Sequence, residues 1–433
     1  MVLNMTNSYM NRVIDKDLER YLNIMGAILL TGPKWCGKTT TAMQHANSIL
    51  NLDDIDNRDQ YLKLAELKPS ELLKGEKPRL IDEWQLAPIL WDGVRQSVDK
   101  TSDKGQYILT GSTSVDESKI RHTGTGRIHR MVMYPMSLYE SGESNGKISL
   151  TELFNNPKID IDGITSDLTV KNLFFAMCRG GWPESLKIEN KEDQLLIARS
   201  YFDSICESDV STVDGVKKNP ERVKNLLKSY ARNISTPTKD TTIMKDIESH
   251  FGKISKGTYY SYINALKRIF VIQNIYAWSP NIRSASTMKA TTKKEFIDPS
   301  IATSALNLTP ERLFHDLNTT GYIFETLCIR DLNVYANKLG GKIHYFRKGD
   351  TLEVDCVLLL NDGRYGLIEI KLGKTEIKKG SKNLHKAEEI IKENIAKNNT
   401  KVPEPSFLAI LTGGELACTK YDDIKIIPIG CLK

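Results

Sequence analysis

The segment that most constrains this chain is AILLTGPKWCGKTT, residues 27–40. It places the pattern GxxxxGK[ST] directly after an apolar run and directly before a stretch of helical character. In this setting the glycines let backbone amides wrap around phosphate groups, and the amino-terminal end of the helix adds a positive potential. The segment therefore predicts a strand, a phosphate-binding loop and a helix, which together open a parallel α/β sheet.

The roles expected in this loop follow from the chemistry of a nucleoside triphosphate. We expect Lys38 to neutralise the β- and γ-phosphates of ATP and the Thr39 hydroxyl to hold Mg²⁺. Gly32 and Gly37 stand at the tight turns. The predicted nucleotide-binding residues are Gly32, Pro33, Lys34, Trp35, Cys36, Gly37, Lys38, Thr39 and Thr40.

A second motif, PRLIDEWQ, is a short apolar strand that ends in two acidic residues. The carboxyl end of a strand is where a parallel sheet delivers a side chain to a bound nucleotide. We expect Asp82 to order the Mg²⁺ shell and Glu83 to orient or deprotonate the attacking water. An exposed acidic turn after a buried strand would give the same letters, but the two motifs in this order favour an ATP site.

Two further groups of residues are candidates for contacts with the γ-phosphate. The strand YILTGS supplies Thr110 and Ser112; Ser112 is the preferred one, and turn residues that cap a helix explain the pattern equally well. Around GTGRIHR lie Arg121, Arg127 and Arg130. A guanidinium can stabilise the charge on a transferred phosphoryl group, so Arg127 is taken as a candidate arginine finger. Solvated surface arginines are the commoner explanation of such residues.

These motifs carry a family resemblance. GPKWCGKTT, ILNLDD, IDEWQLAP, YILTGS and MYPMSLYE are similar to the predicted AAA+ superfamily ATPases of prokaryotes that carry a conserved C-terminal domain of unknown function. RGGWPESL, YFDSICESDV, FETL and IKIIPIG continue the resemblance over nearly the whole chain. The chain departs from the family in a polar stretch near Ser141–Asp162, which leaves the role of Arg127 open. The resemblance implies Mg²⁺-dependent ATP hydrolysis.

Length and composition set the outer limits. The chain has 433 residues, and we expect two to four domains. Its net charge of +6 is compatible with a nucleic-acid partner without establishing one. The seven cysteines form no CxxC pair, which argues against a zinc site or a disulfide framework. No apolar run approaches the roughly 18–20 residues of a membrane span, and the first residues show no secretory pattern. We therefore expect a cytoplasmic protein with no membrane partner.

Residues 1–140 alternate between short apolar runs and helical patterns, as in a parallel α/β sheet. A Gly/Ser-rich passage, ESGESNGK, then indicates a loop or boundary. The strands expected before it are 27–30, 49–52, 79–81, 106–109 and 130–134, with helices at 39–47 and 89–98.

The middle of the chain has the pattern of a winged helix. Helical segments at 221–231, 242–251 and 255–270 precede the strand VIQNIYAW and a basic, hairpin-like stretch. Ser255 is a plausible N-cap of the third helix. That helix would act as a recognition helix on DNA, and its alternative role is to dock the first domain onto the last. The residues expected to face DNA are Lys256, Tyr259, Tyr260, Asn264, Lys267 and Arg268 on the helix, and Arg283, Lys289, Lys293 and Lys294 on the wing.

The last part of the chain contains separated carboxylates and a lysine. Glu325 lies in a helical segment near 322–336, Asp355 lies in LEVDCVLLL, and Glu369 and Lys371 lie in YGLIEIKLG. Alternate residues of a strand share a face, and NDGRYG can join the two strands as a hairpin. Three carboxylates can hold Mg²⁺ and a lysine can activate water. The pattern resembles the PD-(D/E)xK nucleases, which implies Glu325, Asp355 and Glu369 as metal ligands and Asp355, Glu369 and Lys371 as catalytic residues.

The sequence thus predicts an α/β protein with a P-loop parallel-sheet core, a helical and winged-helix middle and a small α/β nuclease-like domain. The expected function is an ATP-binding AAA+-type ATPase whose Mg²⁺-dependent hydrolysis is coupled to engagement, and as a further hypothesis cleavage, of DNA. The alternative is a signalling or scaffold ATPase that switches an interface with a protein partner and whose nuclease-like domain is inactive. The oligomeric state stays open. The expected boundaries are 1–140 for the core, 141–215 for an insertion and helical lid, 216–300 for the winged helix and 301–433 for the nuclease-like domain.

Overall fold

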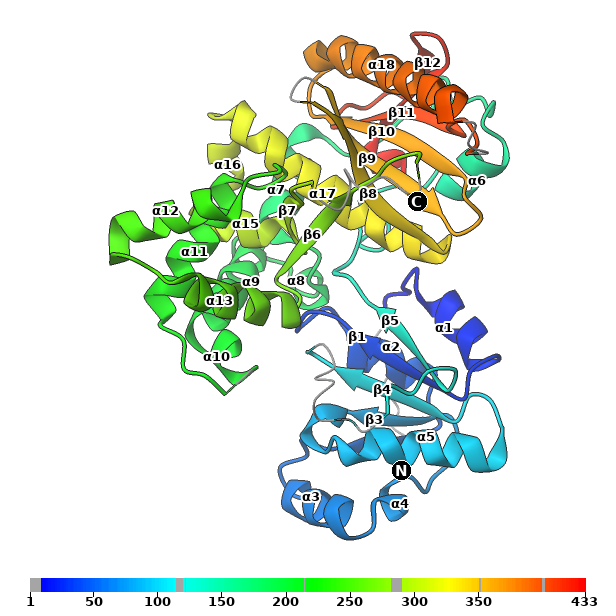
Figure 1. Cartoon of the computed structure of the whole chain (residues 1–433), viewed down its shortest axis with the longest axis vertical. Coiled ribbons are helices and arrows are strands. Elements are labelled where there is room, and N and C mark those ends of the chain that lie inside the picture. Colours follow the sequence, from blue (N-terminus) through cyan, green and yellow to red (C-terminus); the bar gives the residue numbers. More distant parts are fainter. Residues whose placement is uncertain are drawn as a thin grey trace. The chain divides into compact units, whose positions relative to one another are not determined.

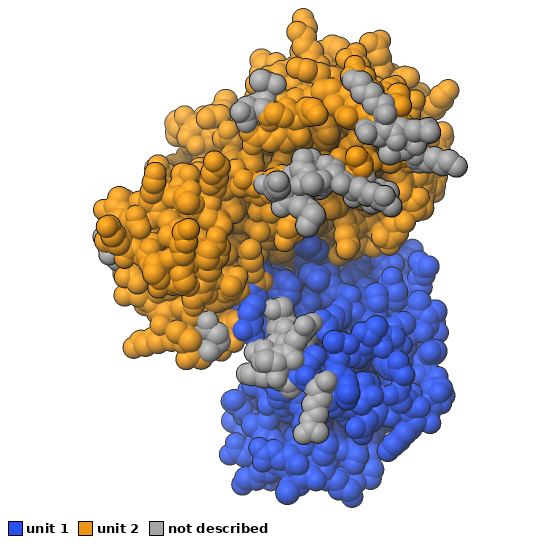
Figure 2. Space-filling view, in the orientation of Figure 1, with its two compact units in different colours: residues 1–134, 268–270 blue, residues 135–267, 271–433 orange. Residues whose placement is uncertain are grey.

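The computed structural model divides into two compact units (Figure 2). The first contains residues 1–134 and 268–270, and the second contains residues 135–267 and 271–433. The four domain boundaries expected from the sequence stay predictions. The residues described are 9–113, 120, 122–213, 215–281, 290–349, 352–398 and 402–433.

The first unit is built on a five-stranded parallel sheet with the order β2-β3-β4-β1-β5 (Figure 1). Every residue of β1 and β4 is buried, as expected for a parallel sheet covered on both faces. All five strands expected from the sequence are confirmed within two residues of their ends. The strands are β1 (Ala27–Thr31), β2 (Ser48–Asn51), β3 (Arg79–Asp82), β4 (Tyr107–Gly111) and β5 (Ile128–Val132).

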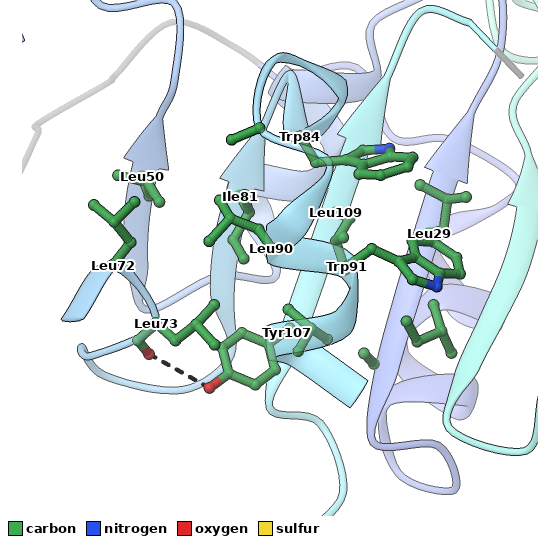
Figure 3. Packing of buried hydrophobic residues seen from close by; sticks show 14 of the residues in the cluster. Leu29, Leu50, Leu72, Leu73, Ile81, Trp84, Leu90, Trp91, Tyr107 and Leu109 are labelled. Atoms are coloured by element: carbon green, nitrogen blue, oxygen red, sulfur yellow. Dashed lines mark hydrogen bonds between the residues drawn. The ribbon is translucent and has the colours of Figure 1, made fainter. Parts of the chain in front are cut away.

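Helices cover this sheet with two separate apolar clusters. One cluster joins α5 (Ile89–Thr101) to the strands through Leu90, Trp91, Leu29 and Leu109 (Figure 3). The other cluster joins the opposite side chains of the strands to the two helices next to the phosphate-binding segment. The sheet therefore has a core on each face, and its strand ends stay free to carry polar groups. The remaining helices of this unit are α1 (Asp15–Leu22), α2 (Lys38–Gln44), α3 (Arg58–Leu67) and α4 (Pro69–Leu72).

The second unit combines a group of helices with a large mixed sheet (Figure 1). Three of the helices fall where the winged-helix pattern was expected: α11 (Pro220–Arg232), α12 (Asp240–Phe251) and α13 (Lys256–Arg268). Ser255 caps α13, since its hydroxyl accepts a 3.0 Å hydrogen bond from the Thr258 amide. The others are α6 (Leu150–Asn155), α7 (Val170–Arg179), α8 (Pro183–Leu186), α9 (Lys191–Ser204), α10 (Val210–Thr212), α15 (Pro299–Ala305), α16 (Pro310–Leu313) and α17 (Leu317–Lys338).

The sheet of the second unit has eight strands in the order β12-β13-β11-β10-β9-β8-β6-β7. Strands β9 and β10 form the expected antiparallel hairpin, and β6 and β7 form a second antiparallel pair at the edge. Helix α17 packs against β8, β9 and β10. The strands are β6 (Ile272–Ala277), β7 (Lys293–Phe296), β8 (Gly341–Lys348), β9 (Leu352–Leu360), β10 (Tyr365–Lys371), β11 (Phe407–Thr412), β12 (Cys418–Lys420) and β13 (Ile424–Pro428).

Helix α18 (Lys374–Asn398) packs on β9, β10 and β11. Gly380 lies within α18, and a Cβ atom at this position would lie 3.5 Å from Ile410 Cδ1. This is an ordinary van der Waals distance, so the packing of α18 on the sheet does not depend on glycine here, and that packing outweighs the weak helical propensity of glycine.

The polar stretch after the first unit packs on the C-terminal sheet. The Ser144 hydroxyl donates to the Leu432 carbonyl at 2.7 Å, and the Lys425 ammonium donates to the Ile159 carbonyl at 2.8 Å. Arg364 Nη1 donates to the Phe154 carbonyl at 3.0 Å. The segment expected to be a loop or boundary is therefore part of the second unit, attached to residues that lie more than 200 positions further along the chain.

A buried ion triad joins distant parts of the second unit. Arg330 on α17 lies 3.0 Å from Asp298 Oδ2 and 2.8 Å from Asp331 Oδ1. Asp298 also accepts hydrogen bonds from the amides of Gly181 and Ser300, each at 2.9 Å. All three charged side chains are buried. Buried charges are tolerated only when they are paired and hydrogen-bonded, so this triad fixes α15 and α17 against the RGGWPESL segment.

Among the residues described, no helix is both long enough and apolar enough to cross a membrane.

Removal of one acid of the triad should strongly destabilise the second unit. Asp298→Ala leaves the Arg330 charge undercompensated and two amides without an acceptor, and we expect it to lower the free energy of unfolding by about 3–5 kcal/mol. Urea denaturation followed by circular dichroism measures the change. Asp362→Ala, which breaks an exposed ion pair with Arg364, is the control and should cost less than about 1 kcal/mol. Equal effects of the two changes would contradict this account of the triad.

Candidate functional site

The phosphate-binding segment forms a tight loop between β1 and α2. Gly32 and Gly37 adopt φ angles of 154° and 98°, conformations that residues with a side chain rarely adopt. A Cβ atom on Gly32 would lie 2.2 Å from the Met133 carbonyl oxygen. The loop is thus held against the chain that follows β5, and only glycine fits at its first turn.

Lys38 is the first residue of α2, and its side chain turns back over the loop. It is buried, and its ammonium donates a 2.7 Å hydrogen bond to the Pro33 carbonyl. Backbone and ammonium donors are therefore gathered around the amino-terminal end of α2, which is the arrangement that phosphate binding requires.

Asp82, at the carboxyl end of β3, accepts hydrogen bonds from two hydroxyl groups. Thr39 Oγ1 donates to Asp82 Oδ1 at 2.9 Å, and Thr110 Oγ1 donates to the same oxygen. Strand β4, which carries Thr110, lies between β1 and β3, so three neighbouring elements bring their polar groups to one point. A hydroxyl and a carboxylate are oxygen ligands that suit Mg²⁺, and the predicted pair Thr39 and Asp82 fits that ion.

Glu83 follows Asp82 in an unusual backbone conformation. Its φ angle is 53°, and non-glycine residues with such angles are enriched at functional sites. Its carboxylate accepts a hydrogen bond from the Gln85 amide. Burial raises the pKa of Glu83 above its ordinary value, although the Gln85 hydrogen bond and the Lys38 charge act in the opposite direction. The role of Gln85 was not foreseen from the sequence.

The remaining candidates lie at different distances from this centre. Ser112 is buried just beyond β4, but Thr110 is the residue that contacts Asp82.

Arg127 precedes β5, and its Nε donates to Asp99 Oδ1 at 2.7 Å. Because β5 runs parallel to β1 with Ile128 opposite Ala27, Arg127 lies at the end of the sheet opposite the loop. A finger role for Arg127 stays a prediction that would need the nucleotide of a second copy. Arg121 lies outside the described residues.

Arg12 contacts the loop and was not foreseen. It is buried, and its Nη1 and Nη2 atoms donate to the carbonyls of Cys36 at 2.7 Å and Tyr134 at 2.9 Å. Cys36 belongs to the phosphate-binding loop, and Tyr134 is the last residue of the first unit. Nothing in the local sequence around Arg12 signals these contacts, because the partners lie 24 and 122 positions away.

The second unit brings the other predicted group together. Glu325 from α17, Asp355 from β9, and Glu369 and Lys371 from β10 line one cavity of about 1090 Å³. The Lys371 ammonium lies 2.7 Å from Asp355 Oδ2 and 2.6 Å from Glu369 Oε2. Asp355 Oδ2 also accepts a 2.8 Å hydrogen bond from the Ile370 amide. The acids and the lysine of the sequence pattern are therefore neighbours.

A second lysine lies among these carboxylates. Lys293 Nζ is 2.5 Å from Glu325 Oε1, 3.1 Å from Glu353 Oε1 and 3.9 Å from Asp355 Oδ1. The expectation that Lys293 and Lys294 lie on an exposed wing is wrong, since their exposed fractions are 1% and 6%. The reason is that every residue of β7 is buried at its place in the sheet.

Three residues of the expected DNA-binding face, Lys294, Tyr259 and Tyr260, bind Asp240 of α12. Lys294 Nζ lies 2.7 Å from Asp240 Oδ1. The hydroxyl of Tyr259, which was expected to be exposed, is on a buried side chain and donates to the same oxygen at 3.2 Å. Lys256 and Asn264 are exposed, as is Tyr260. The wing residues Arg283 and Lys289 lie outside the described residues.

The charges in the cavity wall shift one another's ionisation. Burial alone would lower the pKa of Lys293, but the Glu325, Asp355 and Glu353 carboxylates hold it well above its ordinary value. Burial opposes ionisation of Asp355, yet the Lys371 and Lys293 charges keep its pKa below the usual range. Burial raises the pKa of Glu369 to about 8. The two lysines therefore favour the ionised form of Asp355, whereas burial disfavours the ionised forms of Glu325 and Glu369.

The predicted metal ligands do not form a metal site in this arrangement. Across the described ranges, no three His, Cys, Asp or Glu side chains are grouped so that they could hold a metal ion. The expected convergence of Glu325, Asp355 and Glu369 on one Mg²⁺ ion is thus not found. The physical reason is that the ammonium groups of Lys293 and Lys371 lie between the carboxylates.

The loop, the acidic strand end and the parallel sheet give the first unit the architecture of a P-loop ATPase domain. Residues 25–142 match a family model described as an AAA domain. Residues 170–312 and 320–432 match two models described as domains of unknown function, DUF8612 and DUF4143. The match at the N-terminal part agrees with the geometry of the site, and the other two matches describe no activity.

Curated relatives and solved structures extend this comparison. The chain is 22% identical over 362 residues to uncharacterised proteins of Mycobacterium tuberculosis and Mycobacterium bovis, which covers 82% of this chain and 72% of each relative. Among solved structures, a Walker-type ATPase of Pyrococcus abyssi is 14% identical, with coverage of 69% of this chain and 96% of that chain and a TM-score of 0.45. A TM-score this low does not establish a shared fold.

Loss of Arg12 should weaken ATP binding without unfolding the first unit. Hydrogen bonds from a charged donor contribute about 1.5–3 kcal/mol each, so we expect Arg12→Ala to raise the dissociation constant for ATP by about tenfold or more. Arg12→Lys, which cannot reach both carbonyls at once, should have an intermediate effect. Titration with a fluorescent ATP analogue measures the constants. Arg20→Ala, at an exposed position of α1, is the control and should bind as the wild type does. Wild-type affinity in a folded Arg12→Ala protein would show that these contacts do not support the loop.

Proposed function

We propose that this chain is a Mg²⁺-dependent ATPase that hydrolyses ATP at the loop of residues 32–39. The observation that carries the proposal is the pair of hydroxyls, from Thr39 and Thr110, on one oxygen of Asp82 beside Glu83. Lys38 would exchange the Pro33 carbonyl for the β- and γ-phosphates, and the Thr39 hydroxyl with Asp82 would hold Mg²⁺. The ion would neutralise phosphate charge when bound.

Glu83 is the proposed general base. It lies next to Asp82, and burial raises its pKa, which increases its affinity for the proton of an attacking water. The Gln85 amide holds one of its carboxylate oxygens and thereby fixes the direction of the other. Thr110 is the proposed residue that keeps Asp82 in place. The sequence had offered Thr110 and, preferentially, Ser112 for a different role, contact with the γ-phosphate or the attacking water.

Substitutions at Lys38 and Glu83 separate binding from hydrolysis. Lys38→Ala should lower ATP turnover by at least about 10²-fold, because one preorganised donor to the transferred phosphoryl group is lost. Glu83→Gln should bind ATP but accumulate the unhydrolysed complex. Phosphate release and retention of labelled ATP on a filter measure the two effects. Lys68→Ala, which removes an exposed lysine of the same unit, should stay within twofold of the wild type. Wild-type turnover in Lys38→Ala would refute the assignment of the site.

We further propose that the ATPase engages DNA through the region of α12 and α13. Lys253 and Lys256 are exposed at the start of α13, and Tyr260 and Asn264 are exposed further along the same helix. The antiparallel pair of β6 and β7 follows α13, in the order that the winged-helix pattern requires. The overall net charge of +6 favours an anionic partner.

The rival proposal is a scaffold ATPase that switches an interface with a partner protein. The observation that favours it is the internal use of Tyr259 and Lys294, both bound to Asp240. A face whose basic and aromatic groups are partly occupied in this way has fewer contacts to give to phosphates. Cleavage of DNA is not part of either proposal, because the carboxylates of the second unit are paired with lysines.

The two proposals differ in how affinity for DNA responds to salt. Lys253→Ala with Lys256→Ala should weaken binding to all duplexes, and it should reduce the slope of log affinity against log salt by about 1.8, since each phosphate contact contributes roughly 0.9. Fluorescence anisotropy of a labelled duplex measures both quantities. Lys382→Ala with Lys386→Ala, two exposed lysines of α18, is the matched control. Binding that does not depend on salt, or an equal effect of the two double changes, would favour the protein interface.

A further inference from the structure

Lys293 occupies a position in which a cation is required. It lies on β7, beneath the cavity wall that Glu325, Glu353 and Asp355 line. Its side chain is buried, and the Tyr345 ring covers it at 5.9 Å. Three carboxylates within 4 Å of one buried ammonium form a complete counter-ion shell, so the charge of Lys293 needs the acids as much as the acids need a cation.

Carboxylates and ammonium groups alternate from Glu325 to Glu369 in the cavity wall. Lys293 bridges Glu325 and Asp355, and Lys371 bridges Asp355 and Glu369. Asp355, the central acid, thus has an ammonium on each of its two oxygens. A divalent cation bound to Asp355 would need oxygen ligands at roughly 2.0–2.6 Å and would lie within a few ångströms of both ammonium groups, where like charges repel strongly.

We infer that the cavity of the second unit is a metal-independent binding site in which Lys293 takes the place of the divalent cation. Lys293 satisfies Glu325, Glu353 and Asp355 and excludes Mg²⁺ from them. Whatever ligand enters the cavity is then bound without a metal bridge and is not hydrolysed by metal-activated water. This inference concerns the second unit alone and does not depend on ATP hydrolysis in the first.

The same strand offers a matched control for Lys293. Lys294 is the next residue of β7, it is also buried, and it also forms an ion pair, with Asp240. Of the carboxylates that the structure describes, one lies within the distance of an ion pair from Lys294, compared with three for Lys293. Both lysines can be replaced by methionine, which keeps the length of the side chain and removes the charge. The two variants therefore differ mainly in the number of carboxylates that are left without a cation.

The test is Mn²⁺ binding to the full chain without nucleotide, measured by the loss of the free Mn²⁺ signal in electron paramagnetic resonance. The Lys293→Met variant should gain one site that binds at least tenfold more tightly than any site of the wild type. That gain should disappear in Lys293→Met combined with Asp355→Asn, and Lys294→Met should gain no site. Mn²⁺ should also raise the melting temperature of Lys293→Met and leave that of Lys294→Met unchanged.

Two results would overturn the inference. One is a folded Lys293→Met protein that gains no Mn²⁺ site. The other is a wild-type protein that already binds Mn²⁺ tightly and loses this binding in Asp355→Asn, or that cuts DNA with Mg²⁺ in an Asp355-dependent way. The wild-type measurements decide the question even if Lys293→Met does not fold. Neither result bears on the ATPase, whose Lys38 and Glu83 variants are read separately.

Discussion

The Lys293 ammonium lies 2.5 Å from Glu325 Oε1 in the interior of the second unit, and an unpaired charge at such a place would be strongly destabilising. The same constraint recurs where Arg330 lies between Asp298 and Asp331. Lys293 on β7 has its partner Glu325 on α17, and Arg330 on α17 has one partner, Asp298, directly before α15. These pairs restrict how the elements can pack. Matched buried charge, more than apolar contact alone, therefore specifies how helices and sheet are placed within this unit.

The first unit depends on a different constraint. Its two apolar clusters fill both faces of the parallel sheet, and its chemistry is confined to the carboxyl ends of β1, β3 and β4. There the close approach of Gly32 to the Met133 carbonyl and the two Arg12 contacts hold the backbone of the loop. Backbone contacts hold the nucleotide-binding loop in place, whereas ion pairs between side chains hold the residues of the cavity in the second unit.

The parts of the fold that the sequence predicted well are those encoded locally. The loop at Gly32, Asp82 and the strands around them were foreseen because strand and helix periodicity and the turn glycines lie within a few residues of one another. Glu325, Asp355 and Glu369 were expected to converge on one Mg²⁺ ion. Their spacing over a helix and a hairpin does bring them to one cavity, but lysines lie between them.

Lys293 was misjudged because its partners are remote in the sequence. Adjacent lysines in a short strand indicate a solvated face. Nothing in the neighbouring sequence indicates that Lys293 approaches Glu325 of α17 and Asp355 of β9. Successive residues of a strand point to opposite sides, so Lys293 pairs with the cavity acids while Lys294 pairs with Asp240 of α12. A shift of β7 by one residue would exchange the two sides and leave the carboxylates of one side without an ammonium group. Strand β7 is therefore a rigid tie between α12 and the cavity, and a movement of one must be followed by the other or must break a buried ion pair.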